Sequence, residues 1–445
     1  MLACCSVAQG LRLCLALLVV IPCVFFAPVR SLSLMARRWA PACGSPEGVP
    51  AEMRGLWVVR DSLTSPQSIR QVVETARKYH FNALFVQVRG RGDAYYHSPY
   101  EPRAEALAGQ PPDFDPLRQV IEEAHAHGIA VHAWLNTYLT WSGHRRPASA
   151  RHLWNAHRDW FACDRRGRCT AVPSARTEGA FLQPSHPGVQ EHLFQVFTHV
   201  ALNYDVDGIH FDYVRYAGAD YDYSNAALTR FRAYLLPRLS PQMVAQLDRR
   251  RGKDRLAYVH AFPGEWAVWR RQQVTDLVAR ISAAVRAAKP QVQISAAVFA
   301  DADDARVARG QEWERWLREG IVDAVALMAY DSRTERVVAQ TRRAVQAAGD
   351  RGLVFTGIGA WRLQAHDVAR KIERVRAAGA AGVNLFSYNR VHARPAYLST
   401  LRRGVFASRA VAPRSRRLPP LPVSSALSAG ERPAEGGDAA VPGMP

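Results

Sequence analysis

Lysine is scarce in this chain of 445 residues and occurs only at Lys78, Lys253, Lys289 and Lys371. The formal net charge of +19 therefore comes almost entirely from arginine, which is spread evenly along an alanine-rich sequence. No run of five or more basic residues is present, and no nucleic-acid-binding motif accompanies the charge. We expect no nucleic-acid partner, although the positive field could attract an anionic polymer or surface.

The histidines that we considered as metal ligands lack the spacings that mark metal sites, and the first strand lacks the turn that marks a dinucleotide site. No HxH or HExxH spacing joins the candidate ligands His97, His132, His144, His210 and His260. The first apolar run leads into residues 60–62 (RDS) and not into the glycine-rich turn of a dinucleotide-binding fold. We predict neither a metal ion nor an organic cofactor.

Cysteine is sparse beyond the N-terminal region, which holds five of the seven cysteines. Residues 13–29 form a nearly uncharged run after Arg12, about as long as the core of a secretory signal. We expect residues 1–42 to be a signal peptide or an N-terminal membrane segment, and the protein to be secreted or periplasmic. A lipid on Cys43 would anchor the protein to a membrane, and this alternative stays open.

The two remaining cysteines, Cys163 and Cys169, enclose the short segment DRRGR. In an oxidising compartment such a pair closes a small disulfide loop, which is the interpretation that we favour. A structural zinc site needs four ligands, and only these two cysteines are nearby.

Apolar residues make up 48% of the chain, enough for a large buried core, and from about residue 51 short apolar runs alternate with helical patterns. The predicted strands are Met53–Val59, Ala83–Val88, Ala130–Asn136, Asp207–Val214, Val292–Phe299, Val322–Tyr330, Leu353–Gly359 and Gly382–Tyr388. The predicted helices are Ser68–Lys78, Phe114–His127, Val189–Leu202, Val274–Ala288, Arg306–Arg318, Glu335–Ala348 and Val368–Ala378. Eight such units predict an α/β fold, a (β/α)8 TIM barrel, over residues 52–405.

Two long connections interrupt this alternation. Residues 140–184 follow the third strand and residues 216–271 follow the fourth, so both are predicted to be insertions in the barrel. Residues 411–445 are rich in proline, alanine and glycine and have almost no aromatic residues. We expect this tail to be disordered.

Catalytic groups of a TIM barrel lie at the carboxyl ends of its strands. Polar and aromatic residues gather there in this chain: Gln87, Arg89, Asp93, Trp134, Asn136, His210, Tyr213, Arg215, Tyr330, Trp361 and Tyr388. Aromatic faces can stack on sugar rings while polar groups bind hydroxyls. We predict these residues to be substrate-binding residues of a carbohydrate site.

The fourth predicted strand carries the candidate catalytic acid. Alternation along DGIHFDYV places His210 and Asp212 on the face opposite to Ile209 and Phe211. The apolar pair would pack on the helices, so Asp212 would lie at the mouth of the barrel, within reach of a glycosidic oxygen. The alternative is that Asp212 only forms a buried ion pair with a neighbouring arginine.

Several long stretches occur in the order in which a known family has them: MRGLWVV from Met53, VQVRGRGDAYYHSPYEP from Val86, HGIAVHAWLN from His127, FLQPSHPGVQEHL from Phe181 and VDGIHFDYVRY from Val206. On these motifs the chain resembles the glycosyl-hydrolase-like 10 domain family over roughly residues 52–401. The resemblance implies a (β/α)8 barrel and an extracytoplasmic glycosidase that acts on the glycan strands of peptidoglycan.

The chain departs from the family pattern at two places. Ala217 stands where members commonly have proline, and MAYDS follows the sixth strand where a proline-glutamine-tyrosine-like run is expected. The second departure leaves open which residue works with Asp212.

Glycosidases use two carboxyls, or one carboxyl and the N-acetyl group of the substrate. We predict Asp331 and Asp301 as the catalytic partners of Asp212, although Asp301 could merely cap the next helix. Glu265 is a less favoured candidate. In the DGxDxDxE motif of chitinase-like barrels the last glutamate is the acid, but Val214 occupies that place here. Either Asp212 itself acts, or Glu265 moves in from the insertion.

The sequence thus predicts an exported glycoside hydrolase, a monomer, that acts on an envelope polysaccharide such as peptidoglycan. The alternative is a glycan-binding barrel without activity, and turnover of a glycan would distinguish the two. Contact with a membrane is expected only through the N-terminal segment or a lipid on Cys43.

Overall fold

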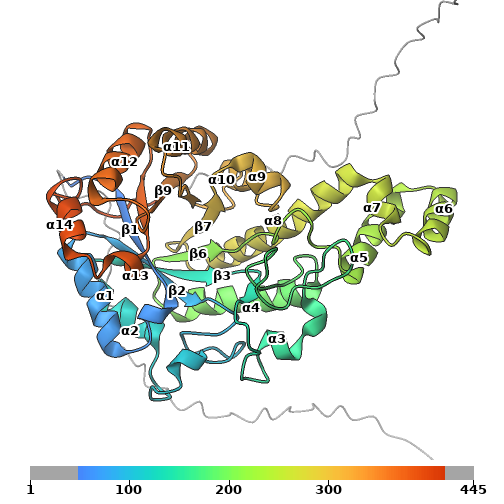
Figure 1. Cartoon of the computed structure of the whole chain (residues 1–445), viewed down its shortest axis with the longest axis horizontal. Coiled ribbons are helices and arrows are strands. Elements are labelled where there is room, and N and C mark those ends of the chain that lie inside the picture. Colours follow the sequence, from blue (N-terminus) through green and yellow to red (C-terminus); the bar gives the residue numbers. More distant parts are fainter. Residues whose placement is uncertain (1–48, 416–445) are drawn as a thin grey trace, which may run out of the picture. The chain divides into compact units, whose positions relative to one another are not determined.

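The computed structural model describes residues 49–415, which are built around a closed barrel of eight parallel strands (Figure 1). Each barrel strand pairs with the next one along the chain, and β1 pairs with β10 to close the ring. The strands are β1 (Met53–Val58), β2 (Ala83–Arg89), β3 (Ala130–Asn136), β6 (Gly208–Asp212), β7 (Gln293–Phe299), β8 (Ala324–Met328), β9 (Leu353–Gly359) and β10 (Gly382–Phe386). The predicted (β/α)8 fold is confirmed, whereas residues 1–42 and most of 411–445 lie outside the described residues.

Helices cover the outside of the barrel (Figure 1). Several begin at polar side chains that accept backbone N–H bonds, such as Ser65 before α1, Asp115 before α2 and Asp301 before α9. The helices around the barrel are α1 (Pro66–Lys78), α2 (Pro116–His125), α4 (Pro187–Asn203), α8 (Pro263–Ala288), α9 (Ala302–Val307), α10 (Trp313–Arg318), α11 (Thr334–Ala348), α12 (Ala365–Ala377), α13 (Tyr388–Val391) and α14 (Pro395–Arg403). None of the helices in residues 49–415 is both long and apolar enough to cross a membrane.

The connection after β7 differs from the prediction of one helix over residues 306–318. Two short helices, α9 and α10, form instead, because the chain turns at Gly310 with a φ of +71°. A Cβ at this glycine would lie 2.9 Å from the ring of Tyr216, so the close packing also requires glycine.

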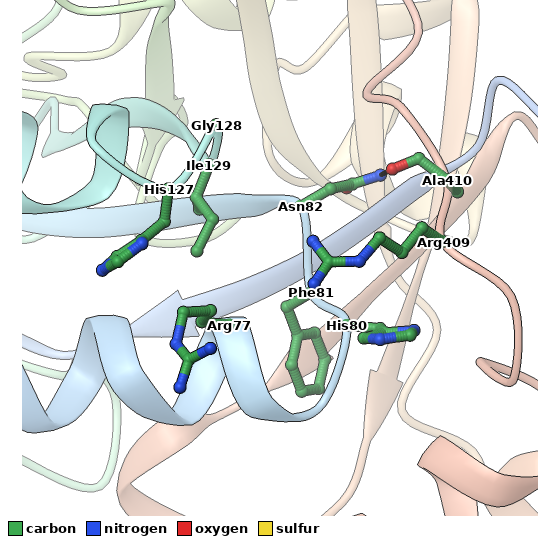
Figure 2. A pocket seen from close by; sticks show the side chains of 9 residues that line it. All are labelled: Arg77, His80, Phe81, Asn82, His127, Gly128, Ile129, Arg409 and Ala410. Atoms are coloured by element: carbon green, nitrogen blue, oxygen red, sulfur yellow. Dashed lines mark hydrogen bonds between the residues drawn. The ribbon is translucent and has the colours of Figure 1, made fainter. Parts of the chain in front are cut away.

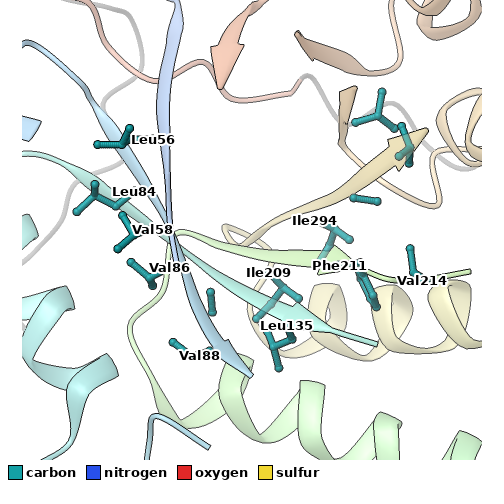
Figure 3. Packing of buried hydrophobic residues seen from close by; sticks show 14 of the residues in the cluster. Leu56, Val58, Leu84, Val86, Val88, Leu135, Ile209, Phe211, Val214 and Ile294 are labelled. Carbon is teal, nitrogen blue, oxygen red and sulfur yellow. The ribbon is translucent and has the colours of Figure 1, made fainter. Parts of the chain in front are cut away.

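Strand alternation sorts the buried side chains into two layers. Residues such as Leu56, Val86, Ile209 and Phe211 point outward and pack against the helices (Figure 3). A second cluster fills the inside of the barrel and contains Met53, Trp57, Ala83, Phe85, Trp134, Ala324, Ala326 and Phe355. Each large side chain buried in this way stabilises the fold by about 1.5–3 kcal/mol.

The insertion after β3 folds over the carboxyl end of the barrel. It contains a small antiparallel pair, β4 (Leu139–Trp141) with β5 (Ala180–Phe181), and the short helix α3 (Leu153–Ala156). The predicted disulfide between Cys163 and Cys169 is confirmed. The buried Asp222 of the next connection accepts a hydrogen bond of 2.8 Å from the Cys163 N–H, which ties the two connections together.

The connection after β6 carries three helices, α5 (Asn225–Leu235), α6 (Pro241–Arg251) and α7 (Ala257–Ala261), which we call the helical excursion (residues 225–262). The excursion has an apolar cluster of its own, separate from the two barrel layers, and Trp266 and Trp269 of α8 belong to it. Helix α8 therefore begins at Pro263, earlier than the predicted Val274, because its first turns pack against the excursion.

Candidate functional site

A pocket of about 400 Å³ opens at the carboxyl end of the barrel, and we call it the rim pocket. Its size falls within the range of pockets that bind small molecules. Its walls come from the ends of most barrel strands and from the first insertion. The lining residues are Trp57, Val59, Arg60, Gln87, Gly90, Trp134, Asn136, Leu139, Ser142, Glu178, Asp212, Tyr213, Arg215, Ala297, Phe299, Met328, Tyr330 and Phe386.

Asp212 is the last residue of β6 and lines this pocket. Its neighbours Ile209 and Phe211 pack outward, and the ring of Phe211 stacks on Phe197 of α4 at 4.5 Å. The predicted alternation of side chains between the two faces of this strand is therefore confirmed. Asp212 is only 8% exposed, and its carboxyl accepts a hydrogen bond of 2.6 Å from the Tyr213 N–H. Burial raises the pKa of Asp212 to about 6, although the Tyr213 N–H and the Arg215 charge oppose this rise.

The backbone turns sharply immediately after Asp212. Tyr213 adopts a φ of +47°, an uncommon conformation for a residue with a side chain. The turn brings Tyr213 from its expected outward side to the pocket wall, where the Arg215 guanidinium lies 4.6 Å from the centre of its ring. Burial raises the pKa of Tyr213 to about 12, so the phenol remains protonated at neutral pH.

Glu178 is a lining residue that the sequence reasoning missed. It lies in the first insertion and pairs with Arg215 at 2.9 Å, with about half of its own side chain exposed. Burial raises the pKa of Glu178, but the Arg215 charge, hydrogen bonds from the backbone and from Arg215, and the Arg309 charge together hold it below its ordinary value. The residue lies just before the FLQPSHPG motif, and its position next to that motif was the only signal that could have indicated it.

A set of hydrogen bonds fixes the polar floor of the pocket. The Asn136 amide oxygen accepts from the Trp134 indole at 3.0 Å and from the Gln87 amide at 3.5 Å. The Asn136 amide nitrogen donates to the Gly90 carbonyl at 2.8 Å. Arg60 in turn donates to the Gln87 amide oxygen at 2.8 Å. These contacts hold four lining side chains in place before any ligand binds.

Aromatic rings form the opposite wall. Tyr330 lies edge-on to Trp57 at 6.4 Å and to Trp361 at 5.1 Å, and Phe386 contacts all three rings. Trp361 does not itself line the pocket but packs behind Tyr330 and Phe386. The wall offers the apolar faces on which pyranose rings stack.

Besides Trp361, four more of the predicted substrate-binding residues lie away from the lining. Arg89 is fully buried and pairs with Glu101 at 2.7 Å, and Asp93 is buried beside Arg91. His210 lies in the barrel interior, where it accepts from the Trp57 indole at 3.2 Å and bonds Ser295 at 2.8 Å. Tyr388 begins α13 and is buried against His392.

The predicted partner carboxyls also lie elsewhere. Asp301 accepts the N–H groups of Asp303 and Asp304 as the cap of α9. Asp331 pairs with Arg333 and Arg336, and its hydrogen bonds with Arg333 lower its pKa to about 2. Glu265 is exposed in the first turn of α8. Asp212 and Glu178 are thus the carboxyls that line the rim pocket.

A smaller pocket of about 60 Å³ lies at the opposite end of the barrel, next to the starts of β2 and β3 (Figure 2). Basic side chains, Arg77, His80, His127 and Arg409, surround it, and Asn82 donates to the Ala410 carbonyl at 3.0 Å. It is too small for a sugar ring. No group of three or more His, Cys, Asp or Glu side chains placed to hold a metal ion occurs among residues 49–415.

Comparison with solved structures identifies similar barrels. The glycoside hydrolase domain of PgaB (BpsB) from Bordetella bronchiseptica superposes with a TM-score of 0.57 at 18% identity, over 79% of this chain and 98% of that domain. The catalytic domain of a β-amylase from Paenibacillus polymyxa superposes with a TM-score of 0.57 at 12% identity, over 81% of this chain and 99% of that one. These likenesses establish the fold.

Comparison with known sequences identifies relatives named for glycosyl hydrolysis. The glycosyl hydrolase YngK of Bacillus subtilis is 28% identical over 52% of this chain and 40% of its own length. The glycosyl hydrolase DigH of Escherichia coli is 26% identical over 54% of each chain. The aligned regions thus span about half, or less, of these relatives. The family profile described as "Glycosyl hydrolase-like 10" matches residues 52–358, more than half of the chain, and the protein therefore belongs to this family.

Proposed function

We propose that the protein is a glycosidase in which Asp212 is the proton donor. The observation that carries the proposal is a buried carboxyl at the end of β6, in the rim pocket, whose pKa is raised to about 6. A general acid must hold its proton near the working pH and release it in the transition state. Asp212 meets the first requirement because burial penalises its ionised form.

Glu178 is the partner carboxyl in this proposal. Its pairing with Arg215 keeps it ionised, so the pocket holds one carboxyl that favours protonation and one that favours charge. Two carboxyls with pKa values pushed apart are the usual arrangement for acid and base roles. Glu178 would act as the base or nucleophile, or would stabilise positive charge that develops on the sugar.

The proposed substrate is the glycan strand of peptidoglycan, on which the protein would act outside the cytoplasm. The family resemblance favours this polymer, and the aromatic wall and polar floor suit a chain of sugar rings. The disulfide between Cys163 and Cys169 supports a secreted or periplasmic location, because disulfides persist in oxidising compartments. We propose that the protein acts there as a monomer.

The test is incubation of the wild-type protein and the Asp212→Asn variant with peptide-free and intact peptidoglycan, with the products identified by mass. The variant keeps the shape of the side chain but cannot supply a proton, so we expect a loss of about 10²–10⁴-fold in turnover with glycan binding retained. Wild-type protein that binds glycan without shortening it would instead indicate a non-catalytic glycan-binding barrel. A folded variant with near wild-type turnover would contradict the role of Asp212.

A further inference from the structure

We propose that a basic surface outside the rim pocket binds a linear polymer that carries many phosphate groups. The surface combines the loop closed by the disulfide (residues 164–168) with the end of α6 and the residues after it (residues 249–255), and we call it the basic surface. Its basic residues are Arg165, Arg166, Arg168, Arg249, Arg250, Arg251, Lys253 and Arg255. None of them lines the rim pocket, so the inference does not depend on the proposed function.

Two segments that lie far apart in the chain meet in the basic surface. Arg255 donates to the Arg165 carbonyl at 2.9 Å and to the Tyr223 carbonyl at 2.7 Å. The Arg165 guanidinium in turn lies 4.6 Å from the centre of the Tyr223 ring. The disulfide loop and the end of the excursion therefore present their charges side by side.

The disulfide loop is fixed at its base. The bond between Cys163 and Cys169 closes it, and the buried Asp164 accepts the N–H groups of Arg166 at 2.9 Å and of Arg168 at 3.0 Å. The Arg166 side chain is exposed and has no hydrogen bond or ion pair with residues 49–415. A ligand that binds this loop therefore has little backbone left to order.

The end of α6 carries more positive charge than its neighbours neutralise. Arg249 and Lys253 are exposed, and neither has an ion-pair partner in the described part of the chain. Arg251 is also exposed and donates only to the Thr229 hydroxyl, at 3.5 Å. Residues 249–253 contain four basic side chains, which repel one another. An anion that binds among them relieves this repulsion.

Clustered arginines suit phosphate better than carboxylate. A carboxylate offers two oxygens, which a single guanidinium group can occupy, whereas a phosphate has further oxygens that accept from a neighbouring arginine. A membrane surface fits less well, because a helix that lies on lipid needs a broad apolar face. Of the large apolar side chains in the excursion, only Met243 is exposed, at 41%. The observations thus favour a polymer in solution over a lipid surface.

The probe is linear polyphosphate, and its binding to the full chain is measured by calorimetry. The salt concentration is about 0.15 M, at which charges more than about 8 Å apart are largely screened. The test variant combines Arg166→Gln, Arg249→Gln, Arg251→Gln and Lys253→Gln, all at exposed positions. We expect it to bind polyphosphate about 10- to 100-fold more weakly than the wild type, because several charge-assisted contacts are lost together.

The matched control combines Arg70→Gln, Arg318→Gln, Arg342→Gln and Arg403→Gln, at exposed positions of the barrel helices α1, α10, α11 and α14. The net charge falls by the same amount as in the test variant. The affinity should change by less than about threefold, because distant charges are screened. Equal losses in the two variants would show that the net charge of the molecule attracts the polymer, and would overturn the inference.

Two further ligands test the chemical class. Polyglutamate of matched charge should bind at least about tenfold more weakly than polyphosphate, and equal binding overturns the assignment of phosphate. Vesicles of phosphatidylglycerol represent a membrane. If the test variant loses vesicle binding but keeps polyphosphate binding, the inference is wrong.

Hydrogen exchange on the wild type locates the contact without any substitution. Polyphosphate should slow exchange in peptides that cover residues 164–169 and 249–255, and unchanged exchange there overturns the inference even if the test variant does not fold. A folded test variant should hydrolyse a soluble glycan as fast as the wild type, since its substitutions lie outside the rim pocket. Failure of the inference therefore leaves the proposed function standing.

Discussion

At the scale of single residues, the proposed chemistry depends on how three charges share the rim pocket. The Arg215 charge lowers the pKa of Asp212, and the Glu178 charge raises it. Burial is the largest influence on this carboxyl, and together with these two charges it sets a pKa of about 6. Removing each charge separately should therefore move the titration of Asp212 in opposite directions.

This opposition predicts the pH dependence of catalysis. If protonated Asp212 is the active form, wild-type kcat/KM should fall as the pH rises through about 6. Glu178→Gln removes a negative charge and should shift this fall to lower pH, whereas Arg215→Gln should shift it to higher pH. Rates measured from pH 4 to 9 on a soluble glycan check the directions. Because Glu178→Gln also removes the proposed partner carboxyl and lowers the rate at every pH, the pH at which each profile falls is compared and not its height. Shifts of both variants in the same direction would contradict the scheme.

At the scale of elements, a buried ion pair holds the strand ends below the pocket. Arg89, the last residue of β2, pairs with Glu101 while both side chains are fully buried, and it also donates to the carbonyls of Asn136 and Thr137. Burial opposes ionisation of Glu101, but the Arg89 charge and the hydrogen bond with His192 together lower its pKa to about 2. The pair thus joins β2, the loop after it and the end of β3.

We expect Glu101→Gln to destabilise the fold by about 3–5 kcal/mol, because it leaves the buried Arg89 without a counter-charge. The matched change is Glu74→Gln, which removes one member of the exposed pair with Arg77 and should cost less than about 1 kcal/mol. Urea unfolding measures both. Equal effects of the two changes would show that the buried pair contributes no more than a surface pair.

Sequence patterns predicted elements better than they predicted the neighbours of side chains. All eight barrel strands were predicted within a few residues of their bounds, because apolar runs of period two mark buried strands. Alternation of side chains along the fourth predicted strand also placed Asp212 on the face that points into the barrel. Alternation along β2 places Arg89 on the inward face as well, but its long side chain turns toward Glu101. The pairing register with β3 also shifts between Gln87 and Arg89.

In the first insertion the apolar residues do not recur at a regular spacing, so its contacts cannot be inferred from the sequence pattern. Glu178 therefore could not be placed opposite Arg215, although both residues are visible in the sequence. The position of Asp331 outside the pocket lining could not be predicted for a similar reason, since its pairing with Arg333 and Arg336 depends on how the chain turns into α11. Contacts between segments that lie far apart in the chain require the fold itself.

At the scale of the whole molecule, the apolar residues form separate clusters. One cluster lies between barrel and helices, one fills the barrel, and one belongs to the helical excursion. The excursion contributes eight of the eleven buried residues in its cluster, far fewer than the barrel buries. Regions with smaller buried cores open locally at lower cost in free energy.

We therefore expect amide hydrogens in α5, α6 and α7 to exchange at urea concentrations at which those of the barrel strands stay protected. Hydrogen exchange followed by mass spectrometry of peptides checks this directly. Peptides from β2, β3 and β6 provide the internal control. Loss of protection in the excursion and the barrel at the same urea concentration would show that the two open as one unit.

The separate packing of the excursion also bears on how such a protein changes over evolutionary time. Residues 225–262 contain eight basic and two acidic residues, and none of them lines the rim pocket. Substitutions on the surface of the excursion can therefore alter the molecule's charge, solubility and attachment to its surroundings while the walls of the pocket stay as they are. Selection on the surface of the excursion and selection on the walls of the pocket act on different stretches of one chain.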